Sequence, residues 1–244
     1  MGTLKGKLWF KKVIDRALDE GYLADDACIA AVIPGFKAQK ANEGGGAVNT
    51  ENYRYFGLTC TFGRLFRRFL AYRLMRFLMR FLPRTFFGCI PGLGTDDSLC
   101  VLRRVLEASR WLRDYCIKLV SVDLRKAFDS LKWQAVGKAR EAWGLTTGSF
   151  VVLLFNIQHG RFYVEGIKTA PNSATYWQEE GVGTGGPESP GIFLMTLAWF
   201  VAAMLRYEKL KVPKHILQEE NKLLPVRELG YMDDLNFLLK NNII

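Results

Sequence analysis

Two adjacent carboxylates at a predicted hairpin tip constrain this chain more than any other feature. Residues 226–231 and 234–239 are rich in apolar side chains, which predicts two strands joined by a tight turn at Met232-Asp233. A single Asp in a turn needs no special explanation, because its side chain bonds the local backbone. Asp233 and Asp234 together place two like charges side by side, and these repel unless something neutralises them. The pair therefore predicts a bound cation at the turn.

A third carboxylate, Asp123, ends a predicted strand over 115–124, and on the two-residue period it shares a face with Ser121. If this strand lies beside the hairpin, Asp123 and Asp233 meet at one edge. Magnesium prefers carboxylate oxygens, water and substrate phosphates, and two such ions can activate a 3′-hydroxyl and stabilise a leaving pyrophosphate. The pattern predicts nucleotidyl transfer. The alternative for Asp123 is an ordinary strand-end carboxylate.

Positive charge is concentrated in one segment of the chain. The formal net charge is +10, and residues 53–95 contain eight arginines and no acid. Such a local excess favours a phosphate backbone as partner, because each neutralised phosphate releases a counterion. The alternatives are a solvated helix face and an amphipathic segment on a membrane surface. The longest apolar run, 191–205, is too short to predict a membrane span.

The spacing of apolar side chains and the residues that begin or end helices predict the other elements. Helices are predicted over 1–30, 61–82, 96–113, 129–143 and 191–205. Strands are predicted over 30–36 and, as a hairpin, over 161–166 and 174–180, and 38–52 is predicted to be a Gly-rich loop. The predicted N-caps are Thr61, Asp96 and Asp129-Ser130. The five cysteines form no CxxC pair, which predicts reduced, mostly buried thiols without disulfides in an intracellular protein.

Several segments, in order, carry a family resemblance. Val122 to Ser130 (VDLRKAFDS) resembles the first palm motif of reverse transcriptases of the non-LTR retrotransposon (LINE-type) and group II intron branch. Gly181 to Phe193 (GVGTGGPESPGIF) is similar to their second motif, and Tyr231 to Asp234 (YMDD) to their third. Upstream, VIPGFK, NYR and FGCIPG resemble fingers motifs of the retrotransposon branch.

The resemblance implies an α+β fold of the right-hand polymerase type, with fingers and a palm whose antiparallel sheet is backed by helices. It implies N-terminal fingers at 1–114, the first acidic palm motif at 115–135, connecting helices and a hairpin at 136–180, and the rest of the palm at 181–244. The family continues with a primer grip and a thumb, whereas this chain ends ten residues after Asp234. We therefore expect no thumb, in a fragment of a longer protein or a decayed copy.

The resemblance also implies site roles. Asp123 and Asp233 would bind two Mg²⁺ ions, with Mn²⁺ as a substitute and Asp234 in support. Phe128 would be the steric gate that favours deoxynucleotides; its alternative is a core aromatic. The remaining nucleotide contacts would come from the second and third motifs, at Gly185, Pro187, Ser189, Tyr231 and Met232. For these the alternatives are an ordinary Gly/Pro turn and plain packing.

The implied partners are an RNA template, a DNA primer and deoxynucleoside triphosphates, with no membrane partner. Lys37 and Arg54 would face the template or the triphosphate, and each is otherwise a surface charge. The template cleft would be lined by Arg64, Arg68, Arg76 and Arg80. A retrotransposon relative would act in the nucleus, and an intron relative in an organelle or the bacterial cytoplasm.

The chain departs from the family pattern where the nucleotide is gripped. Gly183-Thr184-Gly185 replaces the usual Arg-Gln-Gly, and Glu188 stands where an apolar residue is usual, which would add negative charge beside a triphosphate. Ile90 and Leu93 replace two usual arginines. The motifs make an RNA-directed DNA polymerase the first hypothesis. The alternative is a non-catalytic RNA-binding, assembly or intron-maturase-like protein on the same fold.

Overall fold

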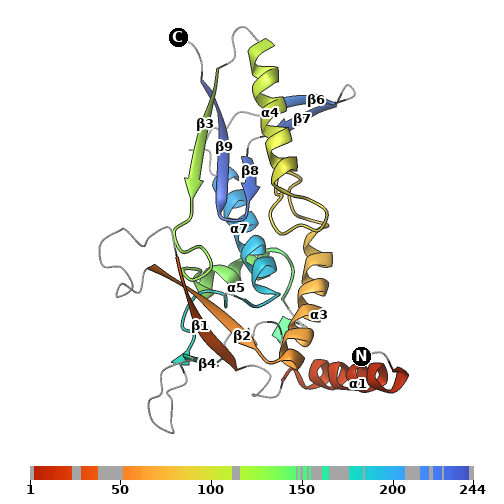
Figure 1. Cartoon of the computed structure of the whole chain (residues 1–244). Helices are drawn as coiled ribbons and strands as arrows, with labels where there is room; N and C mark the ends of the chain where they lie inside the picture. The colour runs from red at the N-terminus through yellow and green to blue at the C-terminus, as the bar shows by residue number, and fades with distance from the viewer. Residues whose placement is uncertain are drawn as a thin grey trace. The chain divides into compact units, whose positions relative to one another are not determined.

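The computed structural model describes residues 3–23, 29–37, 52–111, 116–146, 148, 151–152, 154, 161–164, 176–183, 185–206, 215–219, 222–226 and 228–241 (Figure 1). The chain divides into two compact units, each built from two segments. The first unit contains Met1–Leu74 and Phe128–Ser189, and the second contains Met75–Ala127 and Pro190–Ile244. The predicted loop at 38–52 lies outside the described residues except for Asn52. Which unit corresponds to fingers and which to palm stays a prediction.

The sheet of the first unit has the strand order β2-β1-β4-β5. Its two longer strands, β1 (Ala30–Phe36) and β2 (Tyr53–Thr59), pair antiparallel along their whole length. β4 (Arg161–Val164) pairs parallel with β1 and antiparallel with β5 (Tyr176–Trp177). The predicted strand at 30–36 and the predicted hairpin around 161–180 are confirmed.

The first unit contains α1, α5 and most of α3. α1 (Leu4–Glu20) is shorter than the predicted 1–30, because Gly21 ends it in the left-handed conformation at φ 63°. α5 (Trp133–Ala142) buries Val136 and Ala139. α3 (Thr61–Leu78) continues past Leu74 into the second unit. Its fully buried residues recur at helical spacing, as the sequence predicts: Phe66, Leu70, Leu74 and Leu78.

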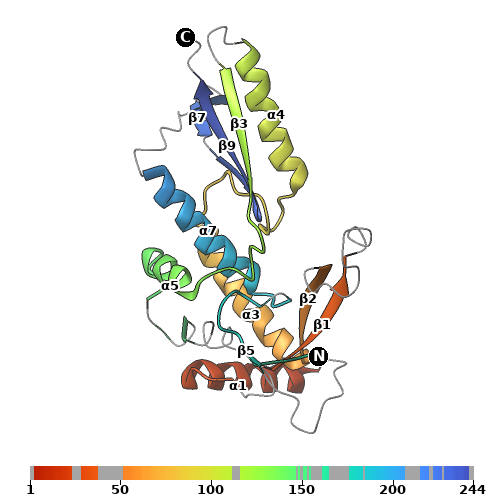
Figure 2. The same ribbon diagram turned by 90° about the vertical axis from the view of Figure 1, so that its left-hand side faces the viewer.

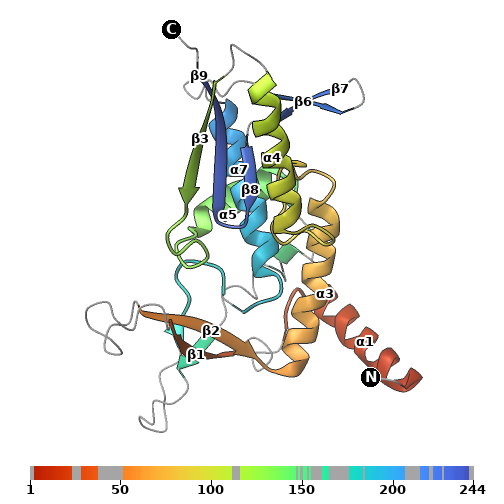
Figure 3. The same ribbon diagram turned by 45° about the horizontal axis from the view of Figure 1, so that its top comes forward.

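The second unit contains a three-stranded antiparallel sheet in the order β3-β9-β8 (Figure 3). The strands are β3 (Cys116–Asp123), β9 (Asp234–Asn241) and β8 (Glu228–Tyr231). A separate hairpin joins β6 (His215–Glu219) to β7 (Lys222–Val226). α7 (Ser189–Arg206) begins at the unit boundary and is almost wholly buried from Ile192 to Ala198.

One helix supports the sheet of the second unit. α4 (Thr95–Trp111) runs beside the strands in Figures 1 and 2 and contacts β8 and β3. Its Val105 joins a buried cluster with Phe87, Leu229 and Leu238. Burial of this cluster holds the carboxylate hairpin in place, because each member stabilises the fold by about 1.5–3 kcal/mol.

Three predicted helix caps are wrong, each by a few residues. Thr61 is the first helical residue, and the Cys60 sulfur accepts from the Gly63 N–H instead. Asp96 lies inside the first turn of α4, where the neighbouring Asp97 accepts from the Gly94 N–H at 2.7 Å. Residues 125–130 form turns, so Asp129-Ser130 precede α5 without capping it, and Lys132 occupies the N-cap.

The exposure of the cysteines and the hydropathy of the helices were also predicted from the sequence. Cys60, Cys89 and Cys100 are free, as predicted, but they are exposed, so the expectation of mostly buried thiols is wrong for these three. Cys28 lies outside the described residues. In the part of the chain that the structure describes, we find no helix with the length and hydropathy that crossing a membrane requires.

Candidate functional site

The carboxylates of the second unit meet at one end of its sheet. β3 pairs with β9, so the strand lies beside the hairpin, and Asp123 lies directly opposite Asp234. The expected meeting of Asp123 with Asp233 stays a prediction. Residues directly opposite each other in an antiparallel pair project from the same face, with Cβ atoms about 4.5–5.5 Å apart. Asp123 and Asp234 are exposed, and Asp233 is half-buried in the turn. Three carboxylates therefore gather within a few residues of one sheet end.

The turn that carries Asp233 is conformationally unusual. Tyr231 pairs with Asp234, which leaves Met232-Asp233 as a two-residue turn. Met232 has φ 57°, in the left-handed region that a non-glycine residue enters only at a cost of about 1–3 kcal/mol. Such strain persists only where the surroundings fix it, and it is typical of functional sites. The turn is therefore held by its neighbours and not by its own preference.

Those neighbours come from the segment after α3. Phe87 donates its N–H to the Gly230 carbonyl at 2.8 Å, and the Gly230 N–H donates to Thr85 at 2.9 Å, so the segment pairs with β8. Gly88 lies so close that a Cβ there would be 2.3 Å from the Met232 backbone nitrogen. The Cys89 Sγ lies 2.8 Å from the Met232 Sδ, and although the residue is exposed as a whole, partial desolvation beside the turn raises the pKa of its thiol.

Tyr231 lies against the core of the second unit. It is half-buried and packs on the cluster that contains Phe87 and Leu229. Met232 is also half-buried, against the segment just described. These packing roles account for both side chains in the structure, and their predicted contacts with primer and nucleotide stay predictions.

The donor set at this sheet end suits a hard divalent cation. Magnesium is usually bound by one or two carboxylates together with water and substrate phosphates. Asp123, Asp233 and Asp234 provide carboxylates of that kind from two adjacent strands and their turn. Across the described residues, no group of three or more His, Cys, Asp and Glu side chains is arranged to hold a metal ion by itself.

The first unit contains the beginning of the second predicted motif, a loop that runs from Gly181 to the first residue of α7, Ser189, and in which Thr184 alone is outside the described residues. At its start, the Gly181 N–H donates to Leu131 at 2.8 Å and the Val182 N–H donates to Phe128 at 2.9 Å. A Cβ at Gly181 would lie 2.7 Å from the Asp129 carbonyl oxygen. The loop is therefore fixed against the segment that carries Phe128, which is half-buried.

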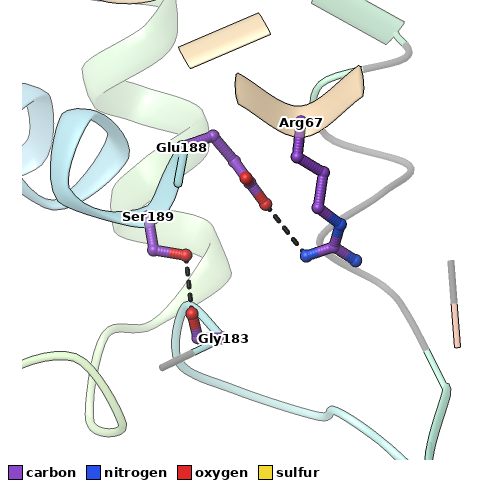
Figure 4. Close-up of polar contacts among 4 residues, drawn as sticks. All are labelled: Arg67, Gly183, Glu188 and Ser189. Carbon is purple, nitrogen blue, oxygen red and sulfur yellow. Dashed lines mark hydrogen bonds and ion pairs between the residues drawn. The ribbon is translucent and has the colours of Figure 1, made fainter. Parts of the chain in front are cut away.

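The middle and end of this loop are fixed by further contacts. Gly185 has φ 107°, and a Cβ there would lie 2.4 Å from the Gly57 carbonyl oxygen of β2. The Ser189 hydroxyl donates to the Gly183 carbonyl at 2.7 Å (Figure 4). Ser189 is buried and Pro187 is half-buried. Ser189 thus shapes the loop from inside, and Gly185 admits the close approach to β2.

Glu188 does not add negative charge to an open site, so that expectation is wrong. Its carboxylate lies 3.1 Å from the Arg67 guanidinium, and the two side chains are 0% and 5% exposed (Figure 4). Arg67 belongs to the buried stripe of α3, three residues before Leu70. By charge alone Arg67 was one of the arginines expected to face phosphate, but its side chain lies on the buried face of α3.

A cavity of about 230 Å³ lies beside the loop in the first unit. Its lining includes Val32, Tyr55, Asp129, Gln178, Glu180 and Gly183. The Gln178 Oε1 is buried without a hydrogen-bond partner among the described residues, and Glu180 forms an ion pair with Lys132. No sequence motif singled out Gln178 or Glu180, because neither position belongs to a repeating pattern.

The predicted nucleic-acid contacts are mostly at the surface. Arg54 is exposed on β2, and Lys37 is half-buried just after β1. Arg64 and Arg68 are exposed on α3 in the first unit, whereas Arg76 and Arg80 are exposed in the second. The predicted site residues thus fall into two groups. Phe128 and the loop belong to the first unit, and the carboxylates with Tyr231 and Met232 belong to the second.

Comparisons with known proteins agree with this architecture. The family described as reverse transcriptase (RNA-dependent DNA polymerase) matches residues 38–243. Among the curated proteins compared with it, none matches the sequence. The structure is similar to apo telomerase from Candida tropicalis truncated from its C-terminal domain, with a TM-score of 0.55 and 9% identity over 96% of this chain and 49% of that one.

It is also similar to telomerase from Candida albicans in complex with a TWJ fragment of telomeric RNA, with a TM-score of 0.52 and 9% identity over 96% of this chain and 42% of that one. The chain thus spans about half the length of these structures or less. At such low identity the similarity concerns the fold, which is the predicted α+β arrangement of reverse transcriptase fingers and palm. Together with the match over most of its length, this shows that the chain belongs to the reverse transcriptase (RNA-dependent DNA polymerase) family.

Proposed function

We propose that this chain carries out RNA-templated DNA synthesis by two-metal nucleotidyl transfer. The observation that supports this most directly is the register of β3 on β9, which brings Asp123 opposite Asp234 and next to the turn residue Asp233. Membership of the reverse transcriptase family gives these carboxylates their chemical context. The motif order supports placing the chain in the retrotransposon or group II intron branch.

Asp123 and Asp233, with Asp234 in support, would hold two Mg²⁺ ions. When bound, such ions activate the primer 3′-hydroxyl and stabilise the leaving pyrophosphate. The chain's own contribution is to concentrate negative charge at one sheet end and to fix the turn. Gly88 and the Thr85–Phe87 segment hold that turn by direct backbone contact.

The incoming deoxynucleotide would lie against Phe128 and the 181–189 loop. Phe128 is tied to the loop through its carbonyl oxygen, which accepts from Val182. A ring at that position excludes a ribose 2′-hydroxyl on steric grounds. Gly185, Pro187 and Ser189 would form the floor of the pocket, and Tyr231 and Met232 would contact the primer end.

An RNA template paired with a DNA primer would bind the basic surface. The exposed arginines Arg54, Arg64, Arg68, Arg76 and Arg80 and the half-buried Lys37 supply cations for phosphates. RNA also offers 2′-hydroxyls to such side chains. The cellular site would follow the origin of the chain, which is the nucleus for a retrotransposon and an organelle or the bacterial cytoplasm for an intron.

Primer extension on an RNA template tests this proposal. With Mg²⁺ and deoxynucleotides, the wild-type chain should extend a DNA primer, and Asp233→Ala should reduce incorporation by at least about 10³-fold, because it removes a ligand for the ions that activate the nucleophile. Asp96→Ala, which removes an exposed carboxylate of α4, is the matched control and should retain activity. Extension that survives Asp233→Ala would refute the role of Asp233.

The second candidate is a non-catalytic RNA-binding protein on the same fold. It is favoured by Ile90 and Leu93, which stand where the family motif carries arginines, and Leu93 is 41% exposed without a charge to offer. This candidate predicts salt-dependent RNA binding with no incorporation at any protein concentration. Robust incorporation by the wild-type chain would exclude it.

A further inference from the structure

The proposed function assigns no role to the buried ion pair between Arg67 and Glu188. The two residues are 121 positions apart, and the Arg67 Nη1 donates to the Glu188 Oε1 at 3.1 Å (Figure 4). Both side chains are at least 95% buried. The loss of hydration largely offsets the attraction within a buried pair, so stability alone does not explain its presence. The geometry that the pair fixes at this place is the better explanation of its presence.

The geometry that the pair fixes is that of the loop. Glu188 lies within the loop, and a Cβ on Gly186 would be 2.9 Å from the Glu188 Oε1, so the carboxylate packs on the loop's own backbone. The Gly186 N–H donates to Gly183 and the Ser189 N–H donates to Gly186, both at 3.1 Å. Arg67 is thus the anchor in α3 for a tightly turned segment.

The anchoring role belongs to Arg67 and not to the exposed arginines beside it in α3. Arg64 and Arg68 point to solvent on either side of Arg67, whereas Arg67 shares the face of Phe66 and Leu70. Moving the loop away from α3 would separate the Arg67 guanidinium from the Glu188 carboxylate. Breaking a buried ion pair is costly, so the pair favours one position of the loop.

We propose that Arg67 is a positioning residue for the incoming deoxynucleotide, acting through Glu188 on the loop that carries Gly185, Pro187 and Ser189. This inference rests on the proposed function, because it assumes that the loop forms the floor of the nucleotide pocket. Arg67 itself would not touch the nucleotide.

Hydrogen exchange of the free protein measures the anchor without any substrate. We compare the wild type with Glu188→Gln, which keeps the shape but removes the charge, and with the double variant Arg67→Met/Glu188→Leu, which replaces the pair by apolar packing. Each single substitution, such as Arg67→Met, should lower Tm by about 10 °C, because it breaks the buried ion pair. The double variant should melt within about 3 °C of the wild type.

In both test variants the amides of Gly186 and Ser189 should exchange at least about tenfold faster, while the amides of β3 and β9 stay protected. The matched control is Arg103→Met, which removes an exposed partner of Glu107 on α4 and should leave the loop unchanged. Unchanged exchange at Gly186 and Ser189 in either folded variant overturns the proposal. If the double variant does not fold, Glu188→Gln decides alone.

Steady-state incorporation gives the second measurement. The double variant should raise KM for the deoxynucleotide about tenfold with kcat within about threefold, because it loosens the pocket without altering the carboxylates. An equal loss in kcat at unchanged KM overturns the positioning role. A wild-type chain that incorporates nothing would refute the proposed function, while the exchange result would still report whether Arg67 anchors the loop.

Discussion

At the residue scale, the carboxylate turn depends on a neighbour that has no side chain. Met232 holds a left-handed φ of 57°, which its own side chain disfavours. Gly88 approaches the Met232 backbone so closely that a Cβ would lie 2.3 Å from its nitrogen. The backbone of one segment therefore holds the strained turn of another, and the position of Asp233 follows from this contact.

We predict that Gly88→Ala destabilises the fold and weakens incorporation together. The added methyl must displace either the turn or the 85–89 segment, and overpacking of this kind costs about 1–3 kcal/mol. Gly137→Ala is the matched control, since a Cβ there meets nothing within 4 Å, and in α5 it should stabilise by up to about 1 kcal/mol. Thermal unfolding measures both changes, and a Gly88→Ala variant as stable and active as the wild type would contradict the prediction.

At the scale of elements, the hairpin is supported by α4. Val105 is 3% exposed and packs with Leu229 of β8 and Leu238 of β9, the two strands that carry the turn. The apolar periodicity of 96–113 predicted this helix well, and the structure has it at Thr95–Trp111. The predicted cap at Asp96 was wrong because the helix begins one residue earlier, at Thr95, and only the geometry shows that Asp97 reaches back to the Gly94 N–H.

We predict that Val105→Ala lowers the free energy of unfolding by about 2–3 kcal/mol, because it removes two methyl groups from a filled core. The comparison is Leu99→Ala on the same helix, where the side chain is 60% exposed and the cost should stay within about 0.5 kcal/mol. Urea denaturation measures both. Equal costs at the two positions would mean that α4 does not support the hairpin through this cluster.

At the scale of the whole molecule, the arginines are of two kinds, exposed and buried, that the sequence does not distinguish. The net charge of +10 comes largely from the arginines of 53–95. Most of those described are exposed, as phosphate partners should be, but Arg67 is buried against Glu188. Binding to RNA should therefore depend on the exposed arginines and be independent of Arg67.

We predict that Arg64→Ala/Arg68→Ala weakens binding to single-stranded RNA and reduces the slope of log K against log salt by about 1.4, since each phosphate contact contributes about 0.7. The matched control is Arg103→Ala/Arg110→Ala, two exposed arginines of α4 outside the predicted contacts. Titration at several salt concentrations measures the slopes. An equal reduction in both double variants would show that the arginines of α3 have no special role.

The sequence by itself determined the local elements and the family to which the chain belongs. Periodicity identified α3, β1 and the hairpin around Met232-Asp233, because side-chain spacing reflects helix and strand geometry directly. The order of the motifs indicated the reverse transcriptase family before any contact was known. These features are encoded within short segments, so the sequence contains all the information that they require.

Only the tertiary structure decided which distant residues meet. It paired Asp123 with Asp234, packed Gly88 against Met232 and joined Arg67 to Glu188 across 121 positions. Such partnerships depend on which faces become buried together, and burial is a property of the assembled fold. An arginine looks the same in the sequence whether its side chain will face a phosphate or a buried carboxylate. For Arg67 the choice was made by its place on the apolar stripe of α3, where solvent cannot reach it.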